Sequence, residues 1–248
     1  MLKRIYFAIV WRILRFLKYI YYYSRIRIYP YKKIAGISIP LQQNWAFTIK
    51  DHILKEDYET GELKIISNTL RANDIVLEIG TGLGFLATYC AQRVGAAKVT
   101  SIEANPFLEV YHQKIFRLNS ITPKVLYKAI GNLDGEMDFY IDRKKFWSSS
   151  LKPFKSKFLQ KIKVSTLNIN HIIETVNPTY LIIDVEGFEC EMIEMVTDFK
   201  AIRKIQMEVH PEVIGKENLD KMKLNLLQRG FNINNALSDE RQYYFEAN

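Results

Sequence analysis

Short apolar runs alternate with amphipathic stretches from Glu56 to the end of the chain, and this alternation limits the folds that the sequence can adopt. The apolar runs have the length of β-strands and end in Gly, Pro or an acidic residue, whereas the stretches between them have the length of helices. Such an order is typical of an α/β fold with a mostly parallel sheet. The predicted strands span residues 74–80, 98–104, 124–131, 180–187 and 205–211, and the predicted helices span residues 83–94, 107–118, 189–196 and 217–229.

Two further segments, residues 136–142 and 241–247, also have the composition of strands. We expect both to pair antiparallel with their neighbours. In sheets of this architecture, ligands bind outside the carboxyl ends of the strands, near the point where the strand order reverses. Functional residues are therefore expected at the ends of the predicted strands.

Charge is unevenly distributed along the 248 residues, whose formal net charge is +8. Residues 1–50 contain ten Lys or Arg and no Asp or Glu, whereas the rest of the chain contains 25 basic and 27 acidic residues. The positive charge thus belongs to the N-terminal segment, and we expect no nucleic-acid partner for the nearly neutral body. Two cysteines, Cys90 and Cys190, are too few for a disulfide framework and indicate a reducing, cytoplasmic environment.

The N-terminal segment has the pattern of a cationic amphipathic helix. Its basic side chains gather on one side of a helical wheel and its apolar ones on the other: Arg4, Arg12, Arg15 and Lys18 against Ile5, Ile9, Ile13, Phe16 and Ile20. The longest uncharged stretch, residues 5–11, is far shorter than the ~20 apolar residues of a membrane-spanning helix. We expect residues 1–28 to bind an anionic membrane surface peripherally. A helix that packs on protein would show the same pattern and remains the alternative.

Pro30, Gly36 and Pro40 interrupt the chain between this helix and the body. We therefore divide the sequence into residues 1–40, comprising the helix and a connection, and residues 41–248, comprising the α/β domain.

The first predicted strand of the body ends in a glycine-rich loop, Glu78-Ile79-Gly80-Thr81-Gly82-Leu83-Gly84, which leads directly into a helix. Glycines let a ligand approach the backbone, and the acid that ends the second strand, Glu103, can accept hydrogen bonds from ribose hydroxyls. S-adenosylmethionine and a nicotinamide dinucleotide both fit this pattern. Glu78 favours S-adenosylmethionine, because a carboxylate at the strand end would repel a pyrophosphate but attract an ammonium group.

Two later strands end in acidic residues and a histidine. Asp184, Glu186 and Glu189 follow the fourth predicted strand, and Glu208 and His210 end the next one, two residues apart and so on one face. If a hydroxyl is methylated, Asp184 or His210 is the candidate base that removes its proton. These side chains are also chemically able to hold a divalent metal, but their spacing does not require one, and we expect none.

The other three histidines, His52, His112 and His171, lie away from the predicted strand ends, and we expect them on the surface or on a helix face. The segment Trp147-Ser148-Ser149-Ser150 follows the strand at 136–142 as a polar loop. The hydroxyls of this loop are expected to contact either solvent or a polyhydroxy substrate.

Taken in order, these motifs resemble those of the FkbM-family methyltransferases, which belong to the class I S-adenosylmethionine-dependent fold. The motifs are EIGTGLG, SIEANP, KAIGNLDGEMDFY, SSSL, LIIDVEGFE and MEVHPE, and the resemblance covers about residues 45–248. It implies a Rossmann-like, seven-stranded, mostly parallel sheet with one antiparallel strand. It also implies S-adenosylmethionine as the cofactor and O-methylation of a sugar, glycolipid or related natural product.

The resemblance further implies where each part of the cofactor binds. It places Glu78, Gly80, Gly82 and Gly84 against the methionine part, Glu103 on the ribose, Ala129, Ile130 and Asn132 near the adenine, and Asp184 and Glu186 beside the transferred methyl group. Ile182 stands where the family often has Lys. A nicotinamide-dependent oxidoreductase and a non-catalytic scaffold with a methyltransferase fold remain the alternative functions, and the oligomeric state stays open.

Overall fold

The computed structural model describes residues 10, 12–14, 16, 17, 20, 21, 24, 30–42, 45, 47–143, 149–151 and 153–247. The chain divides into two compact units, residues 1–58 and 59–248. This boundary falls further along the chain than the division after residue 40 that we predict from the sequence. All the strand-end motifs lie in the second unit.

The first unit contains a hairpin and a helix where the sequence suggests only a connection. Strand β1 (Tyr31–Ile34) pairs antiparallel with β2 (Ile37–Pro40). The two residues between them, Ala35 and Gly36, have φ of 48° and 92°, as in a two-residue type I′ turn. Helix α2 (Phe47–Lys55) follows.

Every described residue between 10 and 24 is helical. Apolar side chains in this segment are largely exposed, with 63% of Phe16 and 56% of Leu17 accessible to solvent. In the part of the chain that the structure describes, no helix combines the length and the apolar composition needed to cross a bilayer.

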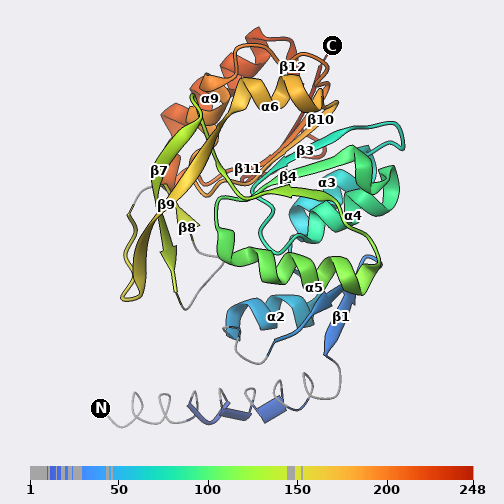
Figure 1. The fold of residues 1–248 in the computed structure, drawn as a ribbon, viewed down its shortest axis with the longest axis vertical. Helices are drawn as coiled ribbons and strands as arrows, with labels where there is room; N and C mark the ends of the chain where they lie inside the picture. Colours follow the sequence, from blue (N-terminus) through green and yellow to red (C-terminus); the bar gives the residue numbers. More distant parts are fainter. Residues whose placement is uncertain are drawn as a thin grey trace. The chain divides into compact units, whose positions relative to one another are not determined.

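The second unit is built around a seven-stranded sheet (Figure 1). Across the sheet the strands are β12 (Phe231–Ile233), β13 (Gln242–Ala247), β11 (Lys204–Glu208), β10 (Tyr180–Ile183), β3 (Val76–Ile79), β4 (Val99–Ile102) and β5 (Lys124–Leu126). Only β13 runs against its neighbours β11 and β12, and the other pairs in this described sheet are parallel. The prediction of a mostly parallel sheet with one antiparallel strand is confirmed.

Helices cover both faces of this sheet (Figure 1). On one face, α6 (Ile169–Val176), α7 (Glu189–Met195) and α9 (Lys216–Gln228) pack against apolar side chains of the strands. The other face carries α3 (Thr60–Thr69), α4 (Phe85–Val94) and α5 (Glu109–Asn119), and the short α8 (Pro211–Ile214) follows β11. In this unit, helices α4, α5, α7 and α9 match the predicted ones, whereas α3, α6 and the short α8 are additional.

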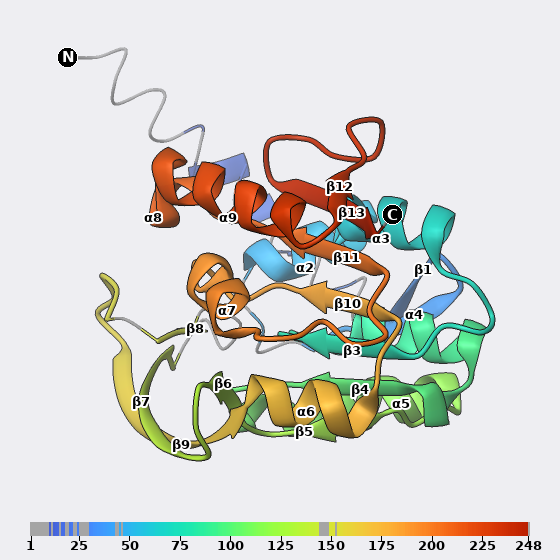
Figure 2. The same ribbon diagram turned by 90° about the horizontal axis from the view of Figure 1, so that it is seen from above.

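A second sheet lies beyond the carboxyl ends of the central strands (Figure 2). Its order is β6 (Ala129–Gly131), β9 (Leu159–Asn168), β7 (Gly135–Asp142) and β8 (Ser149–Ser150). The antiparallel pairing of β7 with β8 and β9 confirms our expectation for residues 136–142. The single strand predicted at 124–131 is wrong, because the chain leaves the central sheet after β5 and then pairs β6 with β9.

The register of the central strands aligns their carboxyl ends. Ile79 pairs with both Ile102 and Ile183, and Ile183 pairs with Met207. The residues that follow these four therefore emerge at one edge of the sheet: Gly80, Glu103, Asp184 and Glu208.

Candidate active site

The glycine-rich loop follows a backbone path that side chains would block. Gly80, Gly82 and Gly84 have φ of 84°, 51° and 82°, values that glycine adopts without steric cost. A Cβ on Gly80 would lie only 1.6 Å from the carbonyl oxygen of Asp184. The ends of β3 and β10 can therefore approach this closely only because Gly80 has no side chain.

Glu78 lies beneath this loop, where it is 1% exposed. The hydroxyl of Ser101 donates a hydrogen bond of 2.5 Å to its Oε2. Burial raises the pKa of Glu78 to about 7, although hydrogen bonds from Ser101, Thr81 and Ala87 favour the charged form. In this position the carboxyl group supports the loop from below.

Glu103 contacts the loop from the neighbouring strand. Its carboxylate accepts hydrogen bonds from the backbone N–H of Gly82 at 3.1 Å and of Asn105 at 2.7 Å. Burial raises the pKa of Glu103 to about 7 against the effect of these hydrogen bonds. Because each carboxylate oxygen has two lone pairs, Glu103 can hold the loop and still accept hydrogen bonds from a ligand.

A cavity with about 700 Å³ of free space, part of it open to solvent, lies beside the loop. Its polar wall includes Glu103, Asp184 and Glu186, and Ser149 and Ser150 of β8 also line it. Its apolar wall includes Ile102, Leu108, Ala129, Ile130, Phe139 and Leu151. Apolar walls with a few polar groups are typical of a small-molecule site.

The cavity brings together most of the residues predicted to bind a cofactor. Those that line it are Gly80, Gly82, Glu103, Ala129, Ile130 and Asp184. Glu78, Gly84 and Asn132 do not. Gly84 begins α4 behind the loop, and Asn132 is exposed, with its carbonyl oxygen 2.6 Å from the side-chain nitrogen of Asn168.

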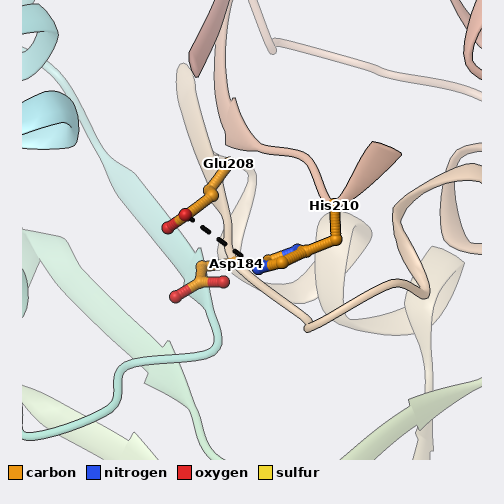
Figure 3. Close-up of side chains that lie close together, drawn as sticks. All are labelled: Asp184, Glu208 and His210. Carbon is orange, nitrogen blue, oxygen red and sulfur yellow. Dashed lines mark ion pairs between the residues drawn. The ribbon is translucent and has the colours of Figure 1, made fainter. Parts of the chain in front are cut away.

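Three of the predicted catalytic residues, Asp184, Glu208 and His210, converge beside this cavity (Figure 3). Asp184 directly follows β10, Glu208 ends β11, and His210 precedes α8. One oxygen or nitrogen atom of each lies within 4.8 Å of those of the other two. The ends of two adjacent strands therefore place two carboxylates and an imidazole at the same point.

Both ring nitrogens of His210 face carboxylates. Its Nδ1 lies 2.9 Å from Oε1 of Glu189, a residue with no solvent exposure. Its Nε2 lies 3.4 Å from Oε2 of Glu186 and 4.0 Å from Oε1 of Glu208. Glu186 has φ of 52°, a left-handed conformation that few non-glycine residues adopt.

Burial and mutual repulsion in this cluster favour carboxyl groups that are protonated or bound to a cation. Burial, followed by the charges of Glu186 and Glu62, raises the pKa of Asp184. Burial and a hydrogen bond with Glu62 raise the pKa of Glu208. Burial lowers the pKa of His210, but its hydrogen bond and the surrounding carboxylates outweigh that effect and raise it.

Glu62 is the member of this cluster that sequence reasoning misses. It lies on α3, is 5% exposed, and accepts a hydrogen bond of 2.9 Å from the side chain of Gln242. No glycine loop or strand end marks it in the sequence. The only signal is an acidic residue beside an apolar helical stretch, ELKII.

His112 lies on a helix, α5, which agrees with one of the two positions that we expect for it, but it is 1% exposed and therefore not on the surface. Its Nε2 lies 2.8 Å from the carbonyl oxygen of Gly82, and its Nδ1 lies 2.9 Å from the hydroxyl of Tyr127. Burial lowers the pKa of His112 to about 4. The neutral ring can thus donate to Gly82 and accept from Tyr127. His52 and His171 are exposed, as we expect.

Comparison with protein families gives one match to the chain. The model of the family described as "Methyltransferase FkbM domain" matches residues 72–233. No curated protein matches the sequence.

Solved structures resemble this chain in fold at low sequence identity. A methyltransferase from Pyrococcus furiosus is 11% identical over 94% of this chain and 97% of its own, with a TM-score of 0.50. TYW2 from M. jannaschii, solved in complex with AdoMet, is 14% identical over 88% of this chain and 86% of its own, with a TM-score of 0.43. The first of these likenesses agrees with a Rossmann-like methyltransferase fold.

Proposed function

Because this chain belongs to the FkbM methyltransferase family, we propose that it is an O-methyltransferase acting on a hydroxyl of a sugar, a glycolipid or a related natural product. The observation that carries the proposal is that two residues connect the cavity with the cluster of carboxylates and His210. Asp184 and Glu186 both line the cavity. Asp184 is also a member of the cluster, and Glu186 contacts His210. A cofactor and an acceptor would therefore meet at these residues.

The glycine loop fits both S-adenosylmethionine and a nicotinamide dinucleotide, and membership of the methyltransferase family identifies S-adenosylmethionine as the cofactor. The residues fit this molecule. The missing side chain at Gly80 opens the backbone beside Asp184, Glu103 has lone pairs for two ribose hydroxyls, and the apolar wall around Ala129 and Ile130 suits a purine ring.

When bound, S-adenosylmethionine supplies an electrophilic methyl group. The chain has then to hold the acceptor in line with that group, because methyl transfer depends mainly on distance and angle. It has also to remove the proton of the acceptor hydroxyl, for which Asp184 or His210 is suitably placed in the cluster. The buried Glu189 accepts from His210 Nδ1 and so directs Nε2 toward the other carboxylates.

We further propose that residues 1–28 attach the enzyme to an anionic membrane surface on the cytoplasmic side. The described residues of this segment are helical and expose apolar side chains, and the segment carries basic residues but no acidic ones. Basic and apolar faces together suit the headgroup region of a bilayer. An acceptor linked to a lipid would be accessible to an enzyme attached in this way.

Thermal unfolding with S-adenosylhomocysteine and with NAD⁺ tests the cofactor. At one hundred times its dissociation constant, the correct ligand stabilises the protein by ~2.7 kcal/mol. We expect a rise in melting temperature with S-adenosylhomocysteine and none with NAD⁺. The reverse would support the oxidoreductase alternative.

A transfer assay with methyl-labelled S-adenosylmethionine tests the acceptor class. We expect the label in lipid or glycan fractions as a base-stable ether, and loss of most turnover in Asp184→Asn and His210→Gln, since general-base assistance contributes ~10² to 10⁴ in rate. Label in amines or thiols would contradict O-methylation. Tight cofactor binding with no transfer to any fraction would favour the scaffold alternative.

A further inference from the structure

We propose that Asp184, Glu208 and His210 form a binding site for one divalent cation, with Mn²⁺ as its best match. The role we give this ion in catalysis rests on the proposed methyltransferase function, but its binding does not. The proposal departs from our expectation of no metal, which was based on spacing in the sequence alone.

The first support is the position of the three donor atoms (Figure 3). A cation with ligand distances of ~2.1 Å holds its ligand atoms no more than ~4.2 Å apart. Here the three atoms lie within 4.8 Å of one another, and Glu208 Oε1 is 4.0 Å from His210 Nε2. Three atoms spaced evenly around one ion at ~2.1 Å lie ~3.6 Å apart, so each donor atom would have to move by up to ~0.7 Å to reach the ion.

The second support is the orientation of the imidazole. A histidine that binds a metal usually donates its other N–H to a carboxylate or carbonyl, which selects the tautomer and directs the free nitrogen at the ion. Glu189 provides this carboxylate for Nδ1 of His210 at 2.9 Å. The same oxygen accepts the backbone N–H of Gly187 at 2.9 Å, so the supporting carboxylate is itself held in place.

The third support is an unpaired acceptor oxygen on one of the three residues of the cluster. Asp184 Oδ1 is buried and has no hydrogen-bond partner among the described residues. A buried carboxylate without a partner is costly, and its neighbours Glu186, Glu208 and Glu62 are acidic as well. A bound cation would satisfy this oxygen and offset the repulsion among the carboxylates.

The donor set indicates which cation would bind. Two carboxylates favour Mg²⁺, Ca²⁺ or Mn²⁺, whereas an imidazole is an unusual ligand for Mg²⁺ or Ca²⁺ and a common one for transition metals. Mn²⁺ satisfies both preferences. Because Asp184 also lines the cavity, an ion at this site would reach an acceptor hydroxyl and lower its pKa. With the ion bound, Asp184 and His210 would serve as its ligands and not as the base, and Glu186, which also lines the cavity, would accept the proton.

Mn²⁺ binding to the full-length protein tests the site. The loss of the electron paramagnetic resonance signal of free Mn²⁺ measures binding, and calorimetry with S-adenosylhomocysteine measures the cofactor site separately. We expect one Mn²⁺ per chain. Glu208→Gln and His210→Gln should each weaken Mn²⁺ binding at least tenfold and leave S-adenosylhomocysteine affinity within twofold, which also shows that the variants are folded.

Glu217→Gln is the matched control, because Glu217 is an exposed carboxylate on α9 that pairs with Lys221. It should bind Mn²⁺ like the unmodified protein. Absence of saturable Mn²⁺ binding, or equal binding by Glu208→Gln and His210→Gln, would overturn the metal site while leaving cofactor binding and the proposed function intact. Mn²⁺ binding through these residues in a protein that transfers no methyl group would support the site and count against the function.

Discussion

Gly80 shows how a single missing side chain lets two strand ends meet. Gly80→Ala would introduce both a positive-φ strain and a collision with the carbonyl oxygen of Asp184. We expect it to lower the free energy of unfolding by at least ~3 kcal/mol. Gly95→Ala is the matched control, because Gly95 has φ of 94° but no atom within 4 Å of the point that a Cβ would occupy. It should cost ~1 to 3 kcal/mol from backbone strain alone in urea unfolding, and less than Gly80→Ala, which adds the collision. Equal losses in the two variants would contradict this account.

If Glu103 binds the ribose, as we propose, cofactor affinity should depend on pH. Its folded pKa of about 7 lies above the ordinary value of 4.5 because of burial, and only the ionised form accepts from both ribose hydroxyls. We expect calorimetry to show S-adenosylhomocysteine affinity rising up to ~10-fold from pH 6 to pH 8. Glu103→Gln should bind more weakly by ~1 to 3 kcal/mol and lose this dependence. If the full dependence persisted in Glu103→Gln, it would have to come from another group, such as Glu78.

The raised pKa of Glu103 also makes folding stability depend on pH, but stability falls with pH where cofactor affinity rises. Between about pH 4.5 and 7 the folded protein keeps a proton on Glu103 that the unfolded chain has released. Stability falls with pH wherever the folded state binds more protons. Glu103 therefore contributes stability that is complete below about pH 4.5 and is lost as the pH rises to about 7.

At the scale of elements, α5 fixes the glycine loop through His112. We expect His112→Phe to keep the ring contacts but leave Gly82 and Tyr127 without their imidazole partner. The free energy of unfolding should fall by ~1 to 3 kcal/mol, and S-adenosylhomocysteine should bind more weakly. His171→Phe, at an exposed histidine, should change stability by no more than ~0.5 kcal/mol. If His112→Phe bound the cofactor normally, the loop would not depend on α5.

The elements themselves differ in how well local sequence predicts them. The buried parallel strands are predictable because runs such as YLII are apolar throughout. Strand β9 is not a continuous apolar run, because Lys161 and Lys163 alternate with apolar residues and lie on its exposed face. The break between β5 and β6 is hidden inside one strand-like run, KVLYKAIG, and is decided by pairing with β9.

At the scale of the whole molecule, charge and cofactor binding belong to different parts of the chain. Deleting residues 1–28 should leave a folded protein that still binds S-adenosylhomocysteine, because the site lies within the compact unit 59–248. The deletion should abolish sedimentation with anionic liposomes. Salt should weaken sedimentation of the full chain, since attraction to lipid decays over a Debye length of ~8 Å.

The opposite outcome would show that residues 1–28 bind protein and not a membrane. If the shortened protein aggregates or changes its oligomeric state, and the full chain does not bind liposomes, residues 1–28 pack on protein. The proposal of membrane attachment would then be wrong.

The sequence by itself determined the α/β class, the succession of most of the central strands along the chain, and the residues that follow each strand end. These features depend on local periodicity and on the rule that parallel strands share a carboxyl edge. Glu103, Asp184 and Glu208 could therefore be assigned to one edge before any coordinate was known.

Only the tertiary structure decided which side chains meet at that edge. Glu62 reaches Glu208 from α3, His112 reaches Gly82 from α5, and Glu78 turns beneath the loop instead of lining the cavity. Such contacts join residues far apart in the chain, and they follow from how helices pack on the sheet. No local pattern encodes that packing, because the apolar face of one helix could pack on the sheet in many ways. The arrangement is fixed only when all side chains of the core pack together.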